Sequence, residues 1–148
     1  MTVKTESNFW KTLKRLWESG DEKYLVSRIE SYVTPGFPDC VVFHKDTGFF
    51  TLELKVVKRN KRGIGRCHIS TLQHAWNVSY ARAGAPVYIL VYDLGRRVVN
   101  LFHGSKTPKL RDNDLDSMVG EALYSGPLPG LQLHKLLNSQ TPQFSANK

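Results

Sequence analysis

One strand-like stretch, Phe49 to Val57, constrains the fold of this chain more than any other feature of its sequence. The stretch is rich in β-branched and aromatic residues, which favours a β-strand. Because successive side chains of a strand point to opposite faces, Glu53 and Lys55 must lie on the same side of the sheet. Charged groups in the middle of a buried strand are costly unless they are paired or bind a metal ion. The pattern therefore predicts either a salt bridge on a half-exposed strand or a functional site.

The residues before this strand predict a β-hairpin. Asp39 to Phe43 is typical of a short strand, and residues 45–48 are typical of a turn. A tight turn there places Asp39 opposite Glu53, and opposed side chains of an antiparallel pair lie on one face, about 5 Å apart at Cβ. Asp39, Glu53 and Lys55 are then expected to converge, unless the register slips by one residue. The same register pairs Val41 with Thr51 and Phe43 with Phe49.

A convergence of this kind has a definite chemistry. Two carboxylates this close repel each other unless a cation lies between them. Oxygen ligands in an open arrangement suit Mg²⁺ or Mn²⁺ better than zinc, and the amine of Lys55 can stabilise a hydroxide or an anionic transition state. Cys40 and Cys67 are spaced neither as a zinc-binding pair nor as a disulfide framework. No phosphate-binding glycine loop or dinucleotide fingerprint is present, so no small-molecule cofactor is expected.

The rest of the chain predicts helices and strands around the hairpin. The apolar residues of Glu6 to Ser19 recur at helical spacing. Tyr24 to Val33 alternates as a strand does, although a continuing helix stays open. A second helix is expected over Ser70 to Ala83, where Ser70 and Gln73 form a capping-box pattern. Strands are expected at residues 86–92 and 98–102, and weaker helical patterns at residues 113–124 and 131–137.

These elements, in the order α-β-β-β-α-β-β, predict an α/β (α+β) protein with a mixed central sheet flanked by helices. Residues 105–148 follow as a C-terminal helical extension. We expect this extension to pack on the core or to form a dimer contact, and not to be a separate domain.

A short motif resembles a known family. Pro38-Asp39, followed after a spacer by Glu53-Leu54-Lys55, resembles the signature of the PD-(D/E)XK nucleases. The run from Gly36 to Asp39 resembles the G-x-P-D variant, which is frequent in phage-encoded nucleases, the VRR-NUC group and Holliday-junction resolvases. The resemblance covers roughly Glu6 to Leu101. It implies a restriction-endonuclease-like core over residues 1–104 and metal-dependent hydrolysis of phosphodiester bonds.

The resemblance also implies a role for each residue of the motif. Asp39 and Glu53 would bind the metal ion, and the backbone carbonyl of Val56 would complete the site. Lys55 would position the attacking water.

Other residues extend the expected site. Some members of the family add a carboxylate from the first helix, for which Glu6 is the candidate, and Glu30 is the alternative. The plainer interpretation of Glu6 is an acid favoured by the helix dipole, and that of Glu30 is a solvated charge. Gln73 matches a glutamine that reaches the active site in several such nucleases, although its capping box alone explains it. We expect His68 and His74 to be solvated, and His44 and His103 to lie in loops.

A basic loop follows the lysine of the motif closely. The chain has a formal net charge of +8, which favours a polyanionic partner. Phosphate contacts from this loop would be independent of DNA sequence and sensitive to salt, although a charge run is most often a solvated loop. The residues expected to contact DNA are Lys58, Arg59, Lys61, Arg62 and Arg66.

Together these features predict a Mg²⁺- or Mn²⁺-dependent endodeoxyribonuclease, either nonspecific or selective for branched DNA such as a Holliday junction. A phage origin and, for a resolvase, a homodimer fit the resemblance. The alternatives are a non-catalytic DNA-binding module with the same fold and an interaction protein whose charges only decorate its surface. No signal-peptide pattern or membrane-spanning run is found. We therefore expect a soluble, cytoplasmic protein, in the host cytoplasm if it is phage-encoded.

Overall fold

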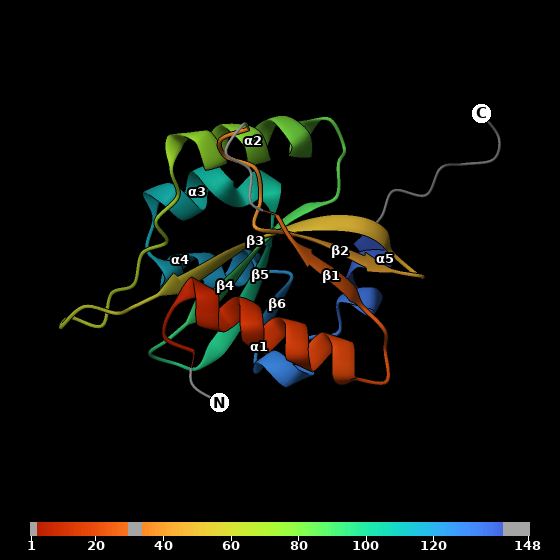
Figure 1. Ribbon diagram of the computed structural model, residues 1–148. Coiled ribbons are helices and arrows are strands. Elements are labelled where there is room, and N and C mark those ends of the chain that lie inside the picture. The colour runs from red at the N-terminus through yellow and green to blue at the C-terminus, as the bar shows by residue number, and fades with distance from the viewer. Residues whose placement is uncertain (1–2, 30–33, 141–148) are drawn as a thin grey trace.

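The computed structural model describes residues 3–29 and 34–140 and forms a mixed α/β fold, in which helices flank a six-stranded sheet (Figure 1). The strands are β1 (Leu25–Arg28), β2 (Cys40–His44), β3 (Gly48–Val57), β4 (Val87–Asp93), β5 (Val98–His103) and β6 (Tyr124–Gly126). The helices are α1 (Glu6–Ser19), α2 (Thr71–Arg82), α3 (Thr107–Asp112), α4 (Leu115–Met118) and α5 (Leu133–Gln140). Short 3-10 turns are η1 (Gly104–Lys106), η2 (Val119–Glu121) and η3 (Leu128–Gly130).

The strands follow one another across the sheet in sequence order. Neighbouring strands are antiparallel except for β3 and β4, which are parallel. A parallel pair needs a crossover connection, and α2 supplies it here. The order predicted for the first seven elements, α-β-β-β-α-β-β, is therefore confirmed, as is the mixed sheet between helices.

The hairpin of β2 and β3 has the predicted register. Val41 pairs with Thr51 and Phe43 with Phe49. Gly48 opens β3 with a φ of 72°, a backbone conformation that favours glycine. Because this register is as expected, the alternation of side chains along β3 also holds.

Hydrophobic clusters lie on both faces of the sheet. α1 and α5 cover one face, where Phe9 and Leu133 belong to the same buried cluster as Leu54. The other face is covered through Leu110 of α3 and Leu115 of α4, and α2 lies on that side as well (Figure 1). The charged side of β3 therefore faces α2, while its apolar side faces α1.

Both long helices begin where the sequence predicts. The side chain of Thr5 caps α1 by accepting a hydrogen bond from the N–H of Asn8 at 3.1 Å. At α2 the capping box is complete. Ser70 Oγ accepts from the N–H of Gln73, and Gln73 Oε1 accepts from the N–H of Ser70, each at 3.1 Å. This box fixes the first turn of α2, and with it the position of the Gln73 side chain.

The helix predicted over residues 113–124 is confirmed only in part, by α4 and η2. Asn113 ends α3 with an extended backbone, and the side chain of Asp114 caps the one-turn helix α4. After η2 the chain forms β6, which pairs with β5. The C-terminal region is thus helical only in part, because pairing with β5 overrides the weak local helical pattern.

Two histidines also differ from expectation. His44 is the last residue of β2 and is buried, and His103 is the last residue of β5. Of the strand expected over Tyr24 to Val33, β1 is confirmed, whereas residues 30–33 lie outside the described residues. No helix in the described ranges has the length and apolar character needed to cross a membrane.

Candidate functional site

The site lies where β2 begins and β3 continues beyond it. The first residue of β2, Cys40, pairs with Leu52, so the part of β3 after Leu52 has no partner in β2. On its other side this part pairs with β4, from Glu53 to Val57. Asp39 precedes Cys40 and therefore lies beside Glu53 at an opening in the sheet.

Two hydrogen bonds bring Asp39 and Glu53 together. The N–H of Asp39 donates to Glu53 Oε2 at 3.2 Å, and the N–H of Leu54 donates to Asp39 Oδ2 at 2.7 Å. Beyond the last β2–β3 pair, Cys40 and Leu52, these backbone-to-side-chain hydrogen bonds hold the two chains together. The structure thus places the two carboxylates side by side, as the register requires.

The third residue of the motif, Lys55, lies on the same face of β3 and is anchored by α2. Its Nζ lies 3.8 Å from Glu53 Oε1 and donates a hydrogen bond to Gln73 Oε1 at 2.9 Å. The amide nitrogen of Gln73 in turn donates to Glu53 Oε1. Gln73 therefore serves both the capping box and the charged cluster, so the two interpretations of this residue hold together.

Gly36 explains how the loop before Asp39 reaches α2. Its φ is 87°, and a Cβ at this position would lie 2.4 Å from the backbone oxygen of Leu72. A side chain there would clash with backbone atoms of the first turn of α2 and would adopt a strained conformation. The glycine of the G-x-P-D run thus lets the loop approach the helix that carries Gln73.

Burial and charge act strongly on Glu53. Its side chain is almost fully buried, at 1% exposure. Desolvation, followed by the charge of Asp39, raises the pKa of the Glu53 carboxyl group well above its usual range, and Lys55 opposes this rise only in part. Burial and a second carboxylate thus disfavour the ionised form of Glu53, and a cation bound beside it would favour that form.

Glu6, at the start of α1, lies on the margin of this cluster. Partial desolvation raises the pKa of its carboxyl group, and the charges of Lys55 and Asp39 act on it in opposite directions. Within the described chain, Glu6 makes no hydrogen bond or ion pair with Asp39, Glu53 or Lys55. Glu6 therefore lies near the predicted ligands without contacting them. Glu30, the alternative, lies outside the described residues.

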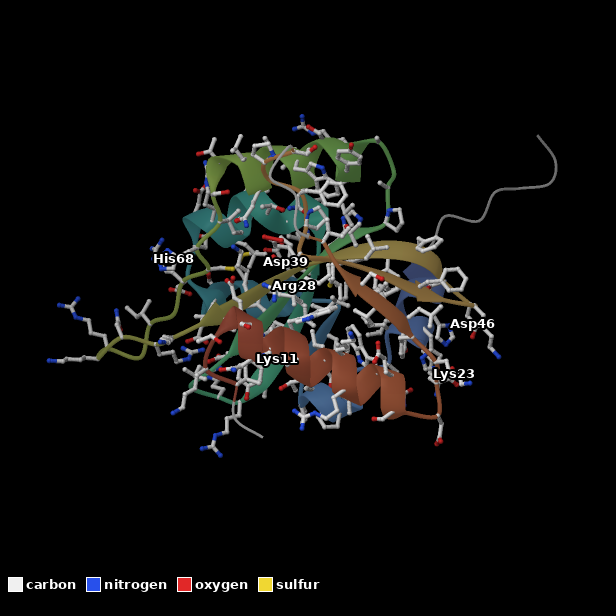
Figure 2. The ribbon with its side chains drawn as sticks, viewed as in Figure 1. Lys11, Lys23, Arg28, Asp39, Asp46 and His68 are labelled. Atoms are coloured by element: carbon white, nitrogen blue, oxygen red, sulfur yellow. The ribbon has the colours of Figure 1, made fainter. Side chains whose placement is uncertain are left out.

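A mainly basic pocket of about 340 Å³ adjoins Glu6. It brings together the start of α1, the end of β3 and the loop that follows β3. Val56, the residue expected to offer its carbonyl, lies in its wall. The other lining residues are Lys4, Thr5, Glu6, Lys58, Arg66 and His68. Figure 2 shows that His68 lies on the side of Asp39 from which the basic loop projects.

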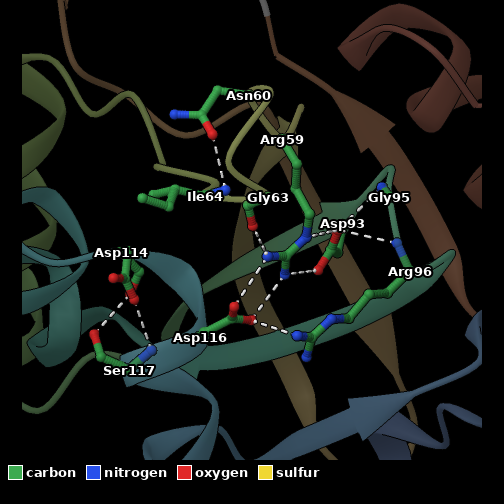
Figure 3. Close-up of polar contacts among 10 residues, drawn as sticks. All are labelled: Arg59, Asn60, Gly63, Ile64, Asp93, Gly95, Arg96, Asp114, Asp116 and Ser117. Atoms are coloured by element: carbon green, nitrogen blue, oxygen red, sulfur yellow. Dashed lines mark hydrogen bonds and ion pairs between the residues drawn. The ribbon is translucent and has the colours of Figure 1, made fainter.

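The basic loop is held by one of its own arginines. Arg59 donates to Asp93 through Nε at 3.1 Å and Nη2 at 2.5 Å, and to Asp116 at 2.8 and 3.0 Å (Figure 3). It also donates to the carbonyl of Gly63 within the loop at 2.6 Å. The other predicted DNA contacts, Lys58, Lys61, Arg62 and Arg66, are exposed. The guanidinium of Arg59 is therefore already paired with two carboxylates of the protein.

Arg28 is a charged residue near the site that sequence reasoning missed. It ends β1 and pairs with Cys40, the residue next to Asp39 (Figure 2). Its charge opposes the increase in the pKa of Glu6, which arises first from desolvation. The signal for Arg28 was the strand pattern itself, because an antiparallel partner of β2 must end near Asp39.

An apolar groove continues the same face of the hairpin away from Glu53. It has a volume of about 260 Å³ and includes Thr51, Phe37, Phe49, Trp76 and Tyr80 in its lining. The rings of Trp76 and Tyr80 stack at 4.1 Å, and Phe49 is 67% exposed. Thr51 Oγ1 and Trp76 Nε1 are buried without a hydrogen-bond partner in the described structure. The groove therefore begins at Thr51, which lies two residues before Glu53 on the same face of β3.

No family model matches the chain, and no curated protein or solved structure matches it either.

Proposed function

We propose that this protein is a metal-dependent endodeoxyribonuclease with a restriction-endonuclease-like core of the PD-(D/E)XK type. The observation that carries the proposal is the convergence of Asp39, Glu53 and Lys55 where the sheet opens. Buried charges of this kind are rare unless they have a function. Their spacing in the sequence and their contacts in space fit the same chemistry.

Asp39 and Glu53 are the residues that would hold a divalent ion. Carboxylate oxygens suit Mg²⁺ or Mn²⁺, and a bound cation would stabilise the ionised form of Glu53, whose pKa is raised by burial and by Asp39. Glu6 at the margin and the carbonyl of Val56 are further candidates. Such an ion, when bound, supplies an activated water and neutralises charge on the phosphate.

Lys55 would act on the attacking water and on the negative charge that develops at the phosphate. Its amine is fixed by Gln73, and Gln73 is fixed by the capping box of α2. A donor held in place in this way stabilises a transition state without reorganising. In this mechanism Gln73 is a positioning residue for Lys55 and Glu53.

Basic side chains beside the cluster would bind the DNA backbone. Lys58 and Arg66 line the pocket that adjoins Glu6, and Lys61 and Arg62 extend along the projecting loop. Contacts of this type position DNA without reading its sequence. We assign Arg59 to holding this loop, because its guanidinium already contacts Asp93 and Asp116.

The aromatic groove favours a substrate with unpaired nucleotides. Bases stack on aromatic side chains with little sequence preference, and the groove lies on the same sheet face as Glu53. Branched DNA, flaps and single strands offer such bases next to a scissile phosphate, whereas an intact duplex does not.

The decisive experiment is a cleavage panel with single-stranded, duplex, flap and four-way DNA in the presence of Mg²⁺, Mn²⁺ or EDTA. We expect metal-dependent cleavage that is fastest on the substrates with unpaired bases. The variant Asp39→Asn keeps the size and hydrogen-bonding capacity of the side chain but loses its charge, and should be inactive. Asp112→Asn, an exposed aspartate on α3, is the matched control and should cleave normally.

The same panel distinguishes the alternative function. A non-catalytic DNA-binding module would bind these DNAs with the same salt dependence but would cleave none of them with any metal ion. Cleavage by Asp39→Asn at the wild-type rate would exclude the assigned centre.

A further inference from the structure

A second group of potential metal ligands lies at the end of β2 opposite to Asp39. Glu22 belongs to the loop between α1 and β1, His44 ends β2, and His134 lies in the first turn of α5. Their ligating atoms all lie within 4.8 Å of one another. Figure 2 shows Asp46, which follows His44 in the hairpin turn, far from Asp39. The group is therefore separate from the proposed catalytic centre.

The two imidazole rings share one carboxylate. His44 Nε2 lies 2.8 Å from Glu22 Oε2, and His134 Nε2 lies 3.9 Å from Glu22 Oε1. The rings stack with centroids 4.9 Å apart and an interplanar angle of 23°. Each ring thus presents the same nitrogen, Nε2, to the same acidic group.

Other polar groups hold the opposite nitrogen of each ring. Tyr24 Oη lies 2.5 Å from His134 Nδ1 and accepts a hydrogen bond from the N–H of His134 at 3.0 Å. His44 Nδ1 accepts a hydrogen bond from the N–H of Asp46 at 3.0 Å, and Asp46 Oδ2 lies 3.9 Å from the same nitrogen. Histidines that ligate metals are usually oriented through their second nitrogen in this way.

Burial and access also fit a ligand site. His44 is buried at 1% exposure, whereas the side chain of Glu22 is 48% exposed. Glu22 lines two surface pockets, one with His44 and the other with His134. Solvent and ions can therefore reach the carboxylate from both sides, while the imidazoles are held inside the fold.

We propose that Glu22, His44 and His134 form a site for Zn²⁺ or a similar transition-metal ion. Two imidazoles and one carboxylate are a common donor set for zinc, with a solvent molecule as fourth ligand, whereas Mg²⁺ prefers oxygen ligands alone. Ligand atoms around a tetrahedral zinc ion lie roughly 3.3 Å apart, given bonds of about 2.0–2.1 Å. In the described structure Glu22 Oε2 lies 2.8 Å from His44 Nε2, Glu22 Oε1 lies 3.9 Å from His134 Nε2, and the ligand atoms of the group lie within 4.8 Å of one another, so the group must contract to hold the ion.

Metal binding requires one defined change in the hairpin turn. In the described arrangement His44 Nδ1 is an acceptor, so the proton of this ring lies on Nε2 and points to Glu22. A metal ion on Nε2 moves the proton to Nδ1. The hydrogen bond from the N–H of Asp46 must then give way to one from Nδ1–H to the carboxylate of Asp46. Occupancy would fasten α5 to the hairpin, because His134 and His44 would share the ion.

The test is zinc binding by calorimetry to the full chain carrying Asp39→Asn, so that the proposed catalytic centre contributes little. We expect one Zn²⁺ per chain, a higher melting temperature, and no comparable effect of Mg²⁺. Glu22→Gln and His134→Gln, each added to that background, should weaken zinc binding at least tenfold. His68→Gln, which changes an exposed histidine away from the group, is the control. Co²⁺ should give the visible absorption of a tetrahedral site only when the three ligands are intact.

Nitrogen NMR of the imidazole rings tests the same proposal independently of folding differences between variants. Without metal, His44 should carry its proton on Nε2, and zinc should move it to Nδ1. The proposal would be overturned if Glu22→Gln and His134→Gln bound zinc as tightly as the Asp39→Asn background. It would also be overturned if the protonation of the ring nitrogens did not change at saturating Zn²⁺. The group would then be a hydrogen-bonded cluster only. If the wild-type protein cleaves no DNA, the zinc proposal is unaffected, because neither calorimetry nor NMR depends on nuclease activity.

Discussion

Two groups of charges flank the parallel strands β3 and β4, and they are compensated very differently. Asp93 in β4 is buried at 1% exposure, yet it accepts hydrogen bonds from the guanidinium of Arg59 and from the backbone N–H groups of Gly95 and Arg96. Glu53 in β3 is equally buried, but its nearest charges are Asp39 and one lysine. In the second group, the pKa of the Glu53 carboxyl is raised far above its usual range.

The comparison distinguishes a structural network from the proposed catalytic centre. A buried carboxylate with a bidentate arginine is satisfied, so it stabilises the loop that carries the partner. A buried carboxylate beside another carboxylate costs stability until a cation arrives, which is typical of a site organised for binding. The following predictions test this division, from the largest expected effect to the smallest.

Loss of one cation from each group should affect cleavage very differently. Lys55→Met removes the amine beside the carboxylates and should lower the cleavage rate by about 10²–10³-fold, because a fixed donor to the transition state is lost. Arg59→Met removes a cation of the structural network and should leave the rate within about tenfold. Single-turnover cleavage measures both. Equal losses in the two variants would abolish the distinction.

Loss of Arg59 should also cost stability, whereas loss of the more exposed Arg96 should cost little. Arg59→Met leaves the carboxylate of Asp93 buried without its partner, so we expect unfolding to become easier by about 2–4 kcal/mol. Arg96→Met is the matched control, since Arg96 pairs with Asp116 at 3.2 Å while its side chain is 57% exposed. Its effect should stay below about 1 kcal/mol. Urea unfolding checks both values, and a similar loss in the two variants would contradict the assigned role of Arg59.

The two roles of Gln73 can be separated by a pair of alanine variants. Ser70→Ala removes only the cap of α2 and should cost about 1 kcal/mol of stability. Gln73→Ala removes part of the cap and also the contacts to Lys55 and Glu53, so cleavage should fall by about 10–100-fold as well. Thermal unfolding and cleavage of each variant are the measurements. A similar loss of activity in Ser70→Ala would mean that Gln73 acts only through the helix.

The raised pKa of Glu53 should be visible as a pH effect on the stability of the metal-free protein. Its pKa in the folded state is raised from 4.5, so folding favours the protonated carboxyl group. This contribution is full below pH 4.5 and is lost as the pH rises through the raised value. In EDTA, Glu53→Gln should therefore be more stable than wild type at neutral pH, by at least about 1 kcal/mol, and the difference should vanish near pH 4. A difference independent of pH would contradict this explanation.

Local patterns were sufficient to predict the part of the fold that carries the proposed site. Helix α1 follows from one amphipathic stripe, and the hairpin register follows from a short turn between two alternating strands. The capping box at Ser70 fixes the start of α2. Each of these signals lies within a few residues of the element that it predicts, so no knowledge of distant contacts is needed.

Features that depend on distant contacts were not predictable in the same way. Tyr24 and His134 meet across 110 positions of the chain, and β6 exists because it pairs with β5. His44 is a different case, since it alternates with Cys40 and Val42 on the face toward the core. Its burial could have been predicted by extending the strand by one residue.

The contact at Gly36 has a consequence for how the proposed centre tolerates change. Here the loop and α2 meet through main-chain atoms, which have no alternative rotamers. The position of Asp39 relative to Gln73 is therefore fixed by a contact between backbones. Displacements of about 1 Å are enough to impair catalysis. A substitution of a surrounding side chain is expected to disturb this alignment less than a side chain at Gly36 would. The alignment depends instead on a residue that has no side chain and touches none of the reacting groups.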